Sequence, residues 1–307
     1  MKGFVLTSFD APPALADDLP RPTLRDHEVL VRVNGSSVNG VDAAIAAGVL
    51  KEMVEHEFPV TLGRDYAGVV EQVGLAVSRY SPGDEVYGFL MHANPTVRHG
   101  SWAEYLVVSE DVSIGPKPAQ VDFHTAGAAP LAGITALAAV DALDLSEGDT
   151  ALVIGATGGV GSVFVQLAAA AGANVIAPAL PEDHEYLRGL GVTAIIDRNA
   201  DIAAQIRSSH PDGVDALLDL VSFTPDASVL KQAGRLASPL GAAGEGPGRS
   251  NLMASPSTSN LERLGALLDA GDVRVHIQER FDLERAGEAL KAFGETHTKG
   301  KLGVTLA

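Results

Sequence analysis

The sequence DTALVIGATGGVGSVFVQLAAAAGANVIA, residues 149–177, decides the fold of this chain. Its apolar run 151–154 ends in the glycine-rich turn 155–161, residues 163–172 have helix-forming composition, and residues 175–177 are apolar again. This order predicts strand, turn, helix and strand. A glycine-rich turn in that setting is typical of a dinucleotide-binding unit with a parallel sheet.

The turn is the candidate phosphate site. Its glycines let the backbone approach a pyrophosphate, and a helix that begins near Gly159 directs N–H groups and a positive dipole end at that anion. A tight turn without a ligand is the alternative interpretation, and the surrounding strand and helix favour the nucleotide. The residues predicted to hold the pyrophosphate are Gly155, Gly158, Gly159, Val160 and Gly161.

The composition argues against several classes of partner and chemistry. A length of 307 residues allows two domains, each with its own core. The 22 Lys and Arg against 39 Asp and Glu give a net charge of -17, which repels phosphate backbones, so no nucleic-acid partner is expected. Cysteine is absent, which removes disulfides and thiolate chemistry. With no signal-like start and no apolar run of about eighteen residues, we expect a cytoplasmic protein without a membrane partner.

The region before the turn is rich in short β-type runs separated by Gly, Pro and Asp, and predicts a compact antiparallel barrel-like domain. One short helix is expected between Ser36 and Gly48, capped by Asn39 or Asp42. The predicted strands are 4–6, 28–33, 68–73, 84–89 and 102–108.

The region after residue 122 alternates between helices and strands, which predicts a parallel sheet with right-handed crossovers. The Gly/Ser/Pro-rich segment 240–259 is expected to be irregular, either a mobile loop over the cofactor or an ordinary surface loop. The last strand is expected to return to the first domain. The predicted helices are 126–130, 133–142, 202–208, 226–232, 261–269 and 283–293, and the predicted strands are 194–196, 216–219, 235–237, 273–277 and 301–306.

Several short motifs, in order along nearly the whole chain, resemble the medium-chain dehydrogenase/reductase superfamily, in its zinc-independent quinone oxidoreductase (zeta-crystallin-like) type. Besides the glycine turn, they are NGVD (39–42), LGRDYAGVV (62–70), GDEVYG (83–88), GSWAEY (100–105), APLAGITA (129–136) and KGKL (299–302). The resemblance implies an α/β protein with a GroES-like β-barrel-type catalytic domain, residues 1–122 and 265–307. A doubly wound Rossmann domain, residues 123–264, would follow, with a nicotinamide cofactor between the two.

The positions that hold zinc ligands in zinc-dependent relatives are different in this chain. Asn39 stands at the cysteine position and Arg64 at the histidine position, and both are poor ligands for Zn²⁺. We therefore expect no metal. The absence of a G-x-S-x-G elbow and of a Walker lysine also speaks against a hydrolase or a P-loop enzyme.

Hydride transfer to an activated acceptor needs no Lewis acid, because a quinone or an enone carries its own electron sink. By resemblance, Asn39 and Asp42 line that catalytic site. The alternative is that Asn39 only caps the short helix. Tyr66, Tyr87 and Tyr105 are available as proton donors, but tyrosines at strand positions are more often packing residues, and none is chosen.

The sequence carries no standard motif for either the ribose 2′-hydroxyl of NAD or the 2′-phosphate of NADP. The second strand ends in Ala177-Pro178 instead of the acidic residue that accepts the ribose hydroxyl in NAD sites. Glu182 and Asp183 would repel a 2′-phosphate, which His184 and Arg188 only partly offset. Family resemblance favours NADP(H), with NAD(H) as the alternative. The further cofactor contacts proposed are Thr135, His184, Ser222, Leu240 and Gly241.

The expected function is NAD(P)H-dependent hydride transfer to a small-molecule quinone or α,β-unsaturated carbonyl. Two alternatives remain open: an enoyl or alkenal double-bond reductase, and a non-catalytic NAD(P)-binding regulatory protein. The loops 92–99 and 240–259 are expected to set the acceptor's size. A homodimer is expected through the edge strand at 273–277.

Overall fold

The computed structural model describes residues 1–91 and 98–306. Its contacts divide the chain into a first unit (Met1–Leu131, Ser255–Gly271 and Val275–Ala307) and a second unit (Ala132–Ala254 and Asp272–Arg274). The sequence places the domain boundaries after residues 122 and 264, whereas the contacts place them after 131 and 254. No helix among the described residues has the length and apolar character needed to cross a membrane.

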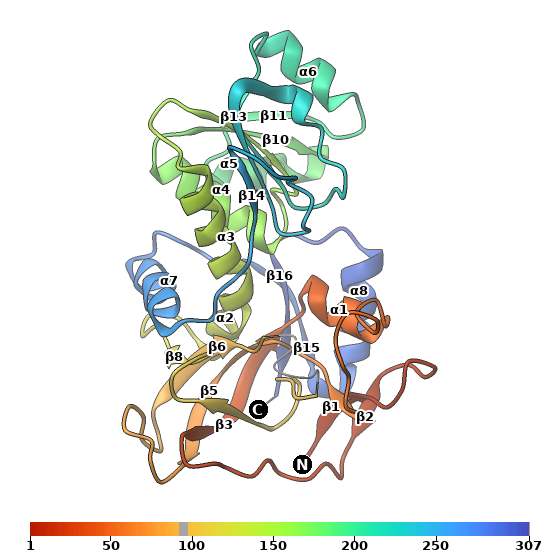
Figure 1. The fold of residues 1–307 in the computed structure, drawn as a ribbon, viewed down its shortest axis with the longest axis vertical. Helices are drawn as coiled ribbons and strands as arrows, with labels where there is room; N and C mark the ends of the chain where they lie inside the picture. Colours follow the sequence, from red (N-terminus) through yellow and green to blue (C-terminus); the bar gives the residue numbers. More distant parts are fainter. Residues whose placement is uncertain (92–97, 307) are drawn as a thin grey trace. The chain divides into compact units, whose positions relative to one another are not determined.

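The first unit is built on a mostly antiparallel sheet in the order β15-β16-β3-β5-β6-β8, with β7 also paired to β3, and on a smaller sheet in the order β2-β1-β4 (Figure 1). Its elements are β1 (Gly3–Leu6), β2 (Ala14–Ala16), β3 (Glu28–Ser37), α1 (Gly40–Ala46), β4 (Val60–Thr61), β5 (Asp65–Val73), β6 (Glu85–Phe89), β7 (Tyr105–Ser109), β8 (Gly115–Pro116), α2 (Phe123–Ala128), α7 (Thr258–Ala270), β15 (Ile277–Asp282), η3 (Leu283–Arg285), α8 (Ala286–Glu295) and β16 (Lys301–Thr305).

Alternation along β3 explains the core of the first unit. Val29, Val31 and Val33 are buried and pack with apolar residues of β5, β6 and β7, as the two-residue period of a strand requires. The final strand β16 pairs antiparallel with β3, which confirms that the end of the chain returns to the first domain. A second cluster includes Phe4, Ile45 and Trp102 beside α1 and α8.

The second unit is a parallel sheet in the order β11-β10-β9-β12-β13-β14. Helix α6 contributes Ala203 and Ile206 to a core formed with residues of β9, β10, β12 and β13, and α4 contacts α5, β9 and β10 (Figure 1). The elements are α3 (Pro130–Leu143, whose first two residues belong to the first unit), β9 (Thr150–Ile154), α4 (Gly159–Ala170), β10 (Asn174–Ala179), η1 (Pro181–Asp183), α5 (His184–Leu190), β11 (Ala194–Asp197), α6 (Ile202–Ser209), β12 (Val214–Asp219), η2 (Ala227–Val229), β13 (Leu230–Ser238) and β14 (Arg249–Asn251).

These two units confirm the predicted fold class, a GroES-like domain with a doubly wound α/β domain. The predicted helix at 226–232 is wrong. Only the short turn η2 forms, and residues from Leu230 onward pair with β12 instead. A helix of seven residues is marginal by itself, and here the ladder with β12 takes its backbone.

The predicted strand at 273–277 is also wrong, because β15 begins only at Ile277. The Arg274 backbone is bonded at both groups to the side chain of Gln166, which donates to the Arg274 carbonyl and accepts from its N–H. The edge strand of the sheet is β15, which overlaps the predicted segment 273–277 only at Ile277, and the homodimer expected there stays a prediction. The segment 240–259 is largely irregular as expected, although β14 forms within it and Ser257 caps α7.

Two helical glycines of the second unit test this packing. A Cβ at Gly161 would lie 2.2 Å from the Gly155 oxygen and 2.7 Å from the Ala156 Cα, so the backbone must shift. Gly161→Ala should lower the free energy of unfolding by about 2 kcal/mol, the usual cost of overpacking. A Cβ at Gly189, in α5, meets nothing within 4 Å, so Gly189→Ala should stabilise by about 0.5 kcal/mol. Denaturant unfolding measures both, and equal changes would contradict the close packing at Gly161.

Candidate functional site

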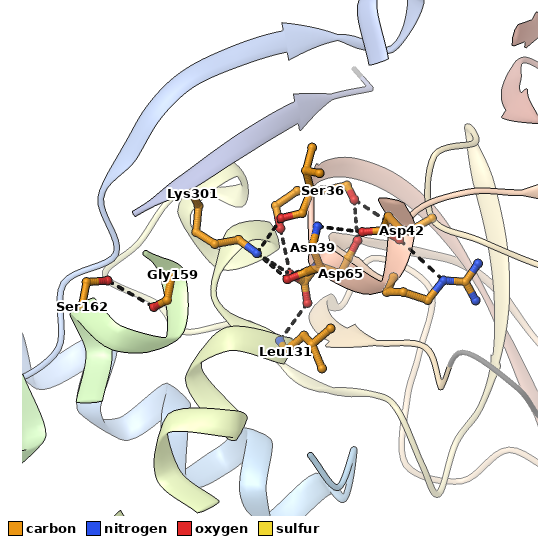
Figure 2. A network of polar contacts seen from close by, with 12 residues as sticks. Ser36, Asn39, Asp42, Asp65, Leu131, Gly159, Ser162 and Lys301 are labelled. Atoms are coloured by element: carbon orange, nitrogen blue, oxygen red, sulfur yellow. Dashed lines mark hydrogen bonds and ion pairs between the residues drawn. The ribbon is translucent and has the colours of Figure 1, made fainter. Parts of the chain in front are cut away.

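A buried polar cluster of the first unit is centred on Asp65, at the start of β5 (Figure 2). Its Oδ2 accepts hydrogen bonds from Ser37 Oγ at 2.7 Å and Asn39 Nδ2 at 2.8 Å, and its Oδ1 accepts one from the Leu131 N–H at 2.8 Å. Lys301 Nζ lies 3.5 Å from Oδ2. A fully buried carboxylate needs such donors, because an unpaired one would be strongly destabilising.

Lys301 enters this cluster from the terminal strand β16. Its Nζ donates to the Val38 carbonyl at 2.9 Å and to Asn39 Oδ1 at 2.5 Å, in addition to its contact with Asp65. The three partners of Nζ are all acceptors, which is the arrangement that an ammonium group with three N–H bonds requires. Desolvation lowers the pKa of Lys301, and the carboxylates of Asp65 and Asp42 oppose that shift.

Asn39 is the N-cap residue of α1, but its side chain also serves the cluster. The carboxylate of Asp42 accepts from the Asn39 backbone N–H at 2.8 Å, as in a capping box. The Asn39 carboxamide is hydrogen-bonded to Lys301 and Asp65. The alternative prediction, that Asn39 only caps the helix, does not account for these two contacts.

Asp42 is paired with a second cation. Its Oδ1 lies 3.8 Å from Arg64 Nε, and both side chains are buried. The Arg64 Nη2 donates to the Thr61 carbonyl at 3.0 Å. Burial raises the pKa of Asp42 to about 6, and the neighbouring Arg64 limits that rise.

The donor set of this cluster does not fit a metal ion. Asn39 and Arg64 occupy the ligand positions predicted from the sequence, and the carboxylates of Asp42 and Asp65 each lie within 4 Å of a cationic side chain. Among residues 1–91 and 98–306, no three His, Cys, Asp or Glu side chains are grouped so as to bind a metal.

The buried tyrosines of this unit have structural roles. Tyr66 donates its hydroxyl proton to the Ser113 carbonyl at 2.7 Å, and Tyr87 donates to the Leu261 carbonyl. Burial raises the pKa of both phenols, so neither is poised to lose a proton. Tyr105 lies under the guanidinium of Arg21.

The glycine turn of the second unit fits a pyrophosphate. Gly155 follows β9 with φ +88°, and Gly158 is the N-cap of α4 with no side chain bonded to the first turn. A Cβ at Gly158 would meet only the Gly155 oxygen, at 3.6 Å, so the turn is open beside the helix start. The N-terminus of a twelve-residue helix left without a side-chain cap is a suitable anion site.

Other predicted cofactor residues follow the neighbouring strands. Ser222 comes after β12, Leu240 and Gly241 after β13, and His184 after β10. Because these strands are parallel, the structure brings the four residues to the same edge of the sheet as the turn, where the strand order reverses between β9 and β12. Thr135 lies instead in helix α3, before β9.

The segment after β10 differs in part from the sequence expectation. Asp183 is fully buried, so Glu182 is the exposed member of the two carboxylates expected to repel a 2′-phosphate. Of the loop 92–99 expected to set the acceptor's size, residues 92–97, including His92, lie outside the described residues.

Sequence reasoning missed three members of the polar cluster: Ser37, Asp65 and Lys301. A signal for two of them was present, since Asp65 and Lys301 are charged residues that begin strands whose next residues are apolar. A charge at such a position implies a buried partner. The partners are far apart in sequence, however, so their identity could not be read from it.

The chain is similar to known proteins in both its sequence and its structure. The alcohol dehydrogenase GroES-like domain family matches residues 25–119, and the zinc-binding dehydrogenase family matches residues 190–302. The chain is 30% identical over 297 residues to the chloroplastic NADPH-dependent alkenal/one oxidoreductase of Arabidopsis thaliana, covering 94% of this chain and 75% of that protein. It is 28% identical over 309 residues to the chloroplast envelope quinone oxidoreductase homolog of the same plant, covering 92% and 91%. The structure of the quinone oxidoreductase from Coxiella burnetii matches with a TM-score of 0.88 and 28% identity, over 100% of this chain and 99% of that one.

The raised pKa of Asp42 predicts a pH effect on stability. Between its ordinary pKa of 3.8 and about 6, the folded protein keeps a proton that the unfolded chain has released, so stability falls as the pH rises through this window. Asparagine cannot ionise. The free energy of unfolding of Asp42→Asn, relative to the unmodified protein, should therefore increase by about 1 kcal/mol from pH 5 to pH 7.

The matched control is Asp215→Asn. Desolvation raises the pKa of Asp215, but hydrogen bonds from Lys231 and the Thr150 N–H hold that pKa below its ordinary value. The difference between this variant and the unmodified protein should stay constant over the same pH range, in urea unfolding curves. A constant difference for Asp42→Asn as well would mean that Asp42 is ionised throughout.

Proposed function

Because this chain belongs to the medium-chain dehydrogenase/reductase superfamily, and within it to the quinone oxidoreductase type, we propose that it reduces quinones or α,β-unsaturated carbonyls with a nicotinamide dinucleotide. The observation that carries the proposal is the buried polar cluster, in which both carboxylates are paired with cations. Carboxylates paired in this way are not available as metal ligands. The site therefore suits a quinone or an enone, which needs no Lewis acid to polarise it.

The cofactor in this proposal is NADP(H), and no zinc takes part. NADPH is named in the description of the Arabidopsis alkenal/one oxidoreductase. Residues Gly155 to Gly161 would hold the pyrophosphate at the start of α4. The end of β10 carries Ala177 and Pro178 where an NAD site places an acidic residue, which supports NADP(H) over NAD(H). When bound, the reduced nicotinamide supplies the hydride.

The residues of the first unit would orient the acceptor and stabilise the charge that it gains. Addition of hydride to an enone carbon places negative charge on the carbonyl oxygen, and the carboxamide N–H of Asn39 is the candidate donor to that oxygen. The charge is then neutralised by a proton. Since Tyr66 and Tyr87 donate to main-chain carbonyls, we propose that water supplies it.

The proposal predicts binding and turnover together. NADPH should bind, as followed by its fluorescence, more tightly than NADH, and its absorbance should fall in the presence of members of a panel of quinones and enones. The panel distinguishes a quinone reductase from a double-bond reductase by which class turns over faster. Binding without turnover of any acceptor would favour the regulatory alternative, and binding of neither nucleotide would contradict the proposal.

A matched pair of variants at Gly158 tests the phosphate site. Serine and aspartate are both good N-cap residues, and the space beside Gly158 accepts a side chain, so both variants should fold. The carboxylate of Gly158→Asp would repel a pyrophosphate at the helix start, so its Kd for NADPH should rise about 100-fold relative to Gly158→Ser. Equal affinities of the two variants would place the pyrophosphate elsewhere.

A further inference from the structure

The contacts of Asn39 fix which way its carboxamide faces. Lys301 Nζ can only donate, so the side-chain atom of Asn39 that it contacts must be the oxygen Oδ1. The other end of the carboxamide is then Nδ2, which donates to the carboxylate of Asp65 at 2.8 Å. Exchanging the two ends would set an NH₂ group against an ammonium and an oxygen against a carboxylate.

This arrangement leaves a defined hydrogen-bonding capacity. Nδ2 carries two hydrogens, one of which goes to Asp65, and the other has no acceptor among the contacts of the described residues. Asn39 keeps 7% of its surface exposed, whereas Asp42 and Asp65 are fully buried. The cluster therefore offers one N–H from a side chain whose orientation is held at both ends (Figure 2).

We propose that Lys301 is a positioning residue, which holds the Asn39 carboxamide so that its second Nδ2–H is presented to the acceptor oxygen. This inference rests on the proposed function and assigns a task within it to a residue of the terminal strand. Lys301 acts through Asn39 and does not itself contact the acceptor, since its three N–H bonds are directed to Val38, Asn39 and Asp65.

The ammonium contributes orientation and polarisation. A cation on the amide oxygen draws electron density away from the nitrogen, which makes the remaining N–H a stronger donor. In a low-dielectric site, a donor already in position needs no reorganisation when negative charge develops on the acceptor. Removing Lys301 leaves the carboxamide held at one end, free to rotate and without this polarisation.

A double-mutant cycle tests the coupling of Lys301 and Asn39. Loss of one positioned donor of this kind lowers kcat by about 100-fold, so Asn39→Ala and Lys301→Met should each cause a loss approaching that size. Because both residues act through the same N–H, the kcat of the double variant should lie within about threefold of the kcat of Asn39→Ala. Steady-state kcat and KM for one enone, measured at saturating NADPH, give the four corners of the cycle.

Lys117 provides a matched control for loss of a buried lysine. Its Nζ donates to the main-chain carbonyls of Pro118 and Val121 and pairs with Glu85, and only 6% of its side chain is exposed. It makes no contact with Asn39. Lys117→Met should lower the Tm, as Lys301→Met should, and leave kcat within about twofold of the unmodified protein, because only stability is affected.

Lys301→Gln extends the test if Lys301→Met does not fold, since it keeps a polar group and an N–H donor in the same place. Its kcat should fall at least about tenfold when Asn39 is present, and the same change should have no effect on kcat when it is added to Asn39→Ala. Equal losses in the two backgrounds, or no loss in either, would overturn the positioning role. Failure of the proposed function is a different result, because the unmodified protein would then reduce none of the acceptors.

Discussion

The buried carboxylate of Asp65 is the constraint on which the first unit depends. It must be supplied with hydrogen bonds, and its donors come from the end of β3, the N-cap of α1, the backbone at Leu131 and the terminal strand β16. These donors are 26 to 236 residues away from it in sequence. Leaving such a charge unpaired in the interior costs several kcal/mol, so the arrangement that satisfies it is strongly favoured over its alternatives.

The same constraint determines the chemistry of the site. With Lys301 beside Asp65 and Arg64 beside Asp42, the carboxylates neutralise cations and are not free to bind a metal. In the proposed function, the group that acts on the ligand is the Asn39 carboxamide, which suits an acceptor with its own electron sink. In the second unit, the open turn at Gly158 and the start of α4 suit a pyrophosphate. The two features together support a reductase of activated acceptors.

Local patterns predicted much of this structure. The strand, turn and helix around residues 149–177 follow from apolar runs and glycines that are adjacent in sequence, and the structure confirms them. The wrong elements are those in which distant contacts override local preference: residues from Leu230 pair with β12, and the Arg274 backbone bonds to Gln166. The Lys301–Asp65–Asn39 contacts were missed for the same reason. Asp65 and Lys301 lie within the motifs LGRDYAGVV and KGKL, but only folding brings residues so distant in sequence together.

Isotope transfer tests directly whether the protein passes a hydride from a nicotinamide to an activated acceptor. NADPH carrying deuterium at one or the other face of the nicotinamide C4 would be incubated with the protein and an enone, and the product examined by mass spectrometry. One of the two labelled cofactors should deliver its deuterium to the β-carbon of the reduced enone, and the other should not. A reduced enone without deuterium from either cofactor, or no reduction of any quinone or enone of the panel, would contradict the proposed hydride transfer.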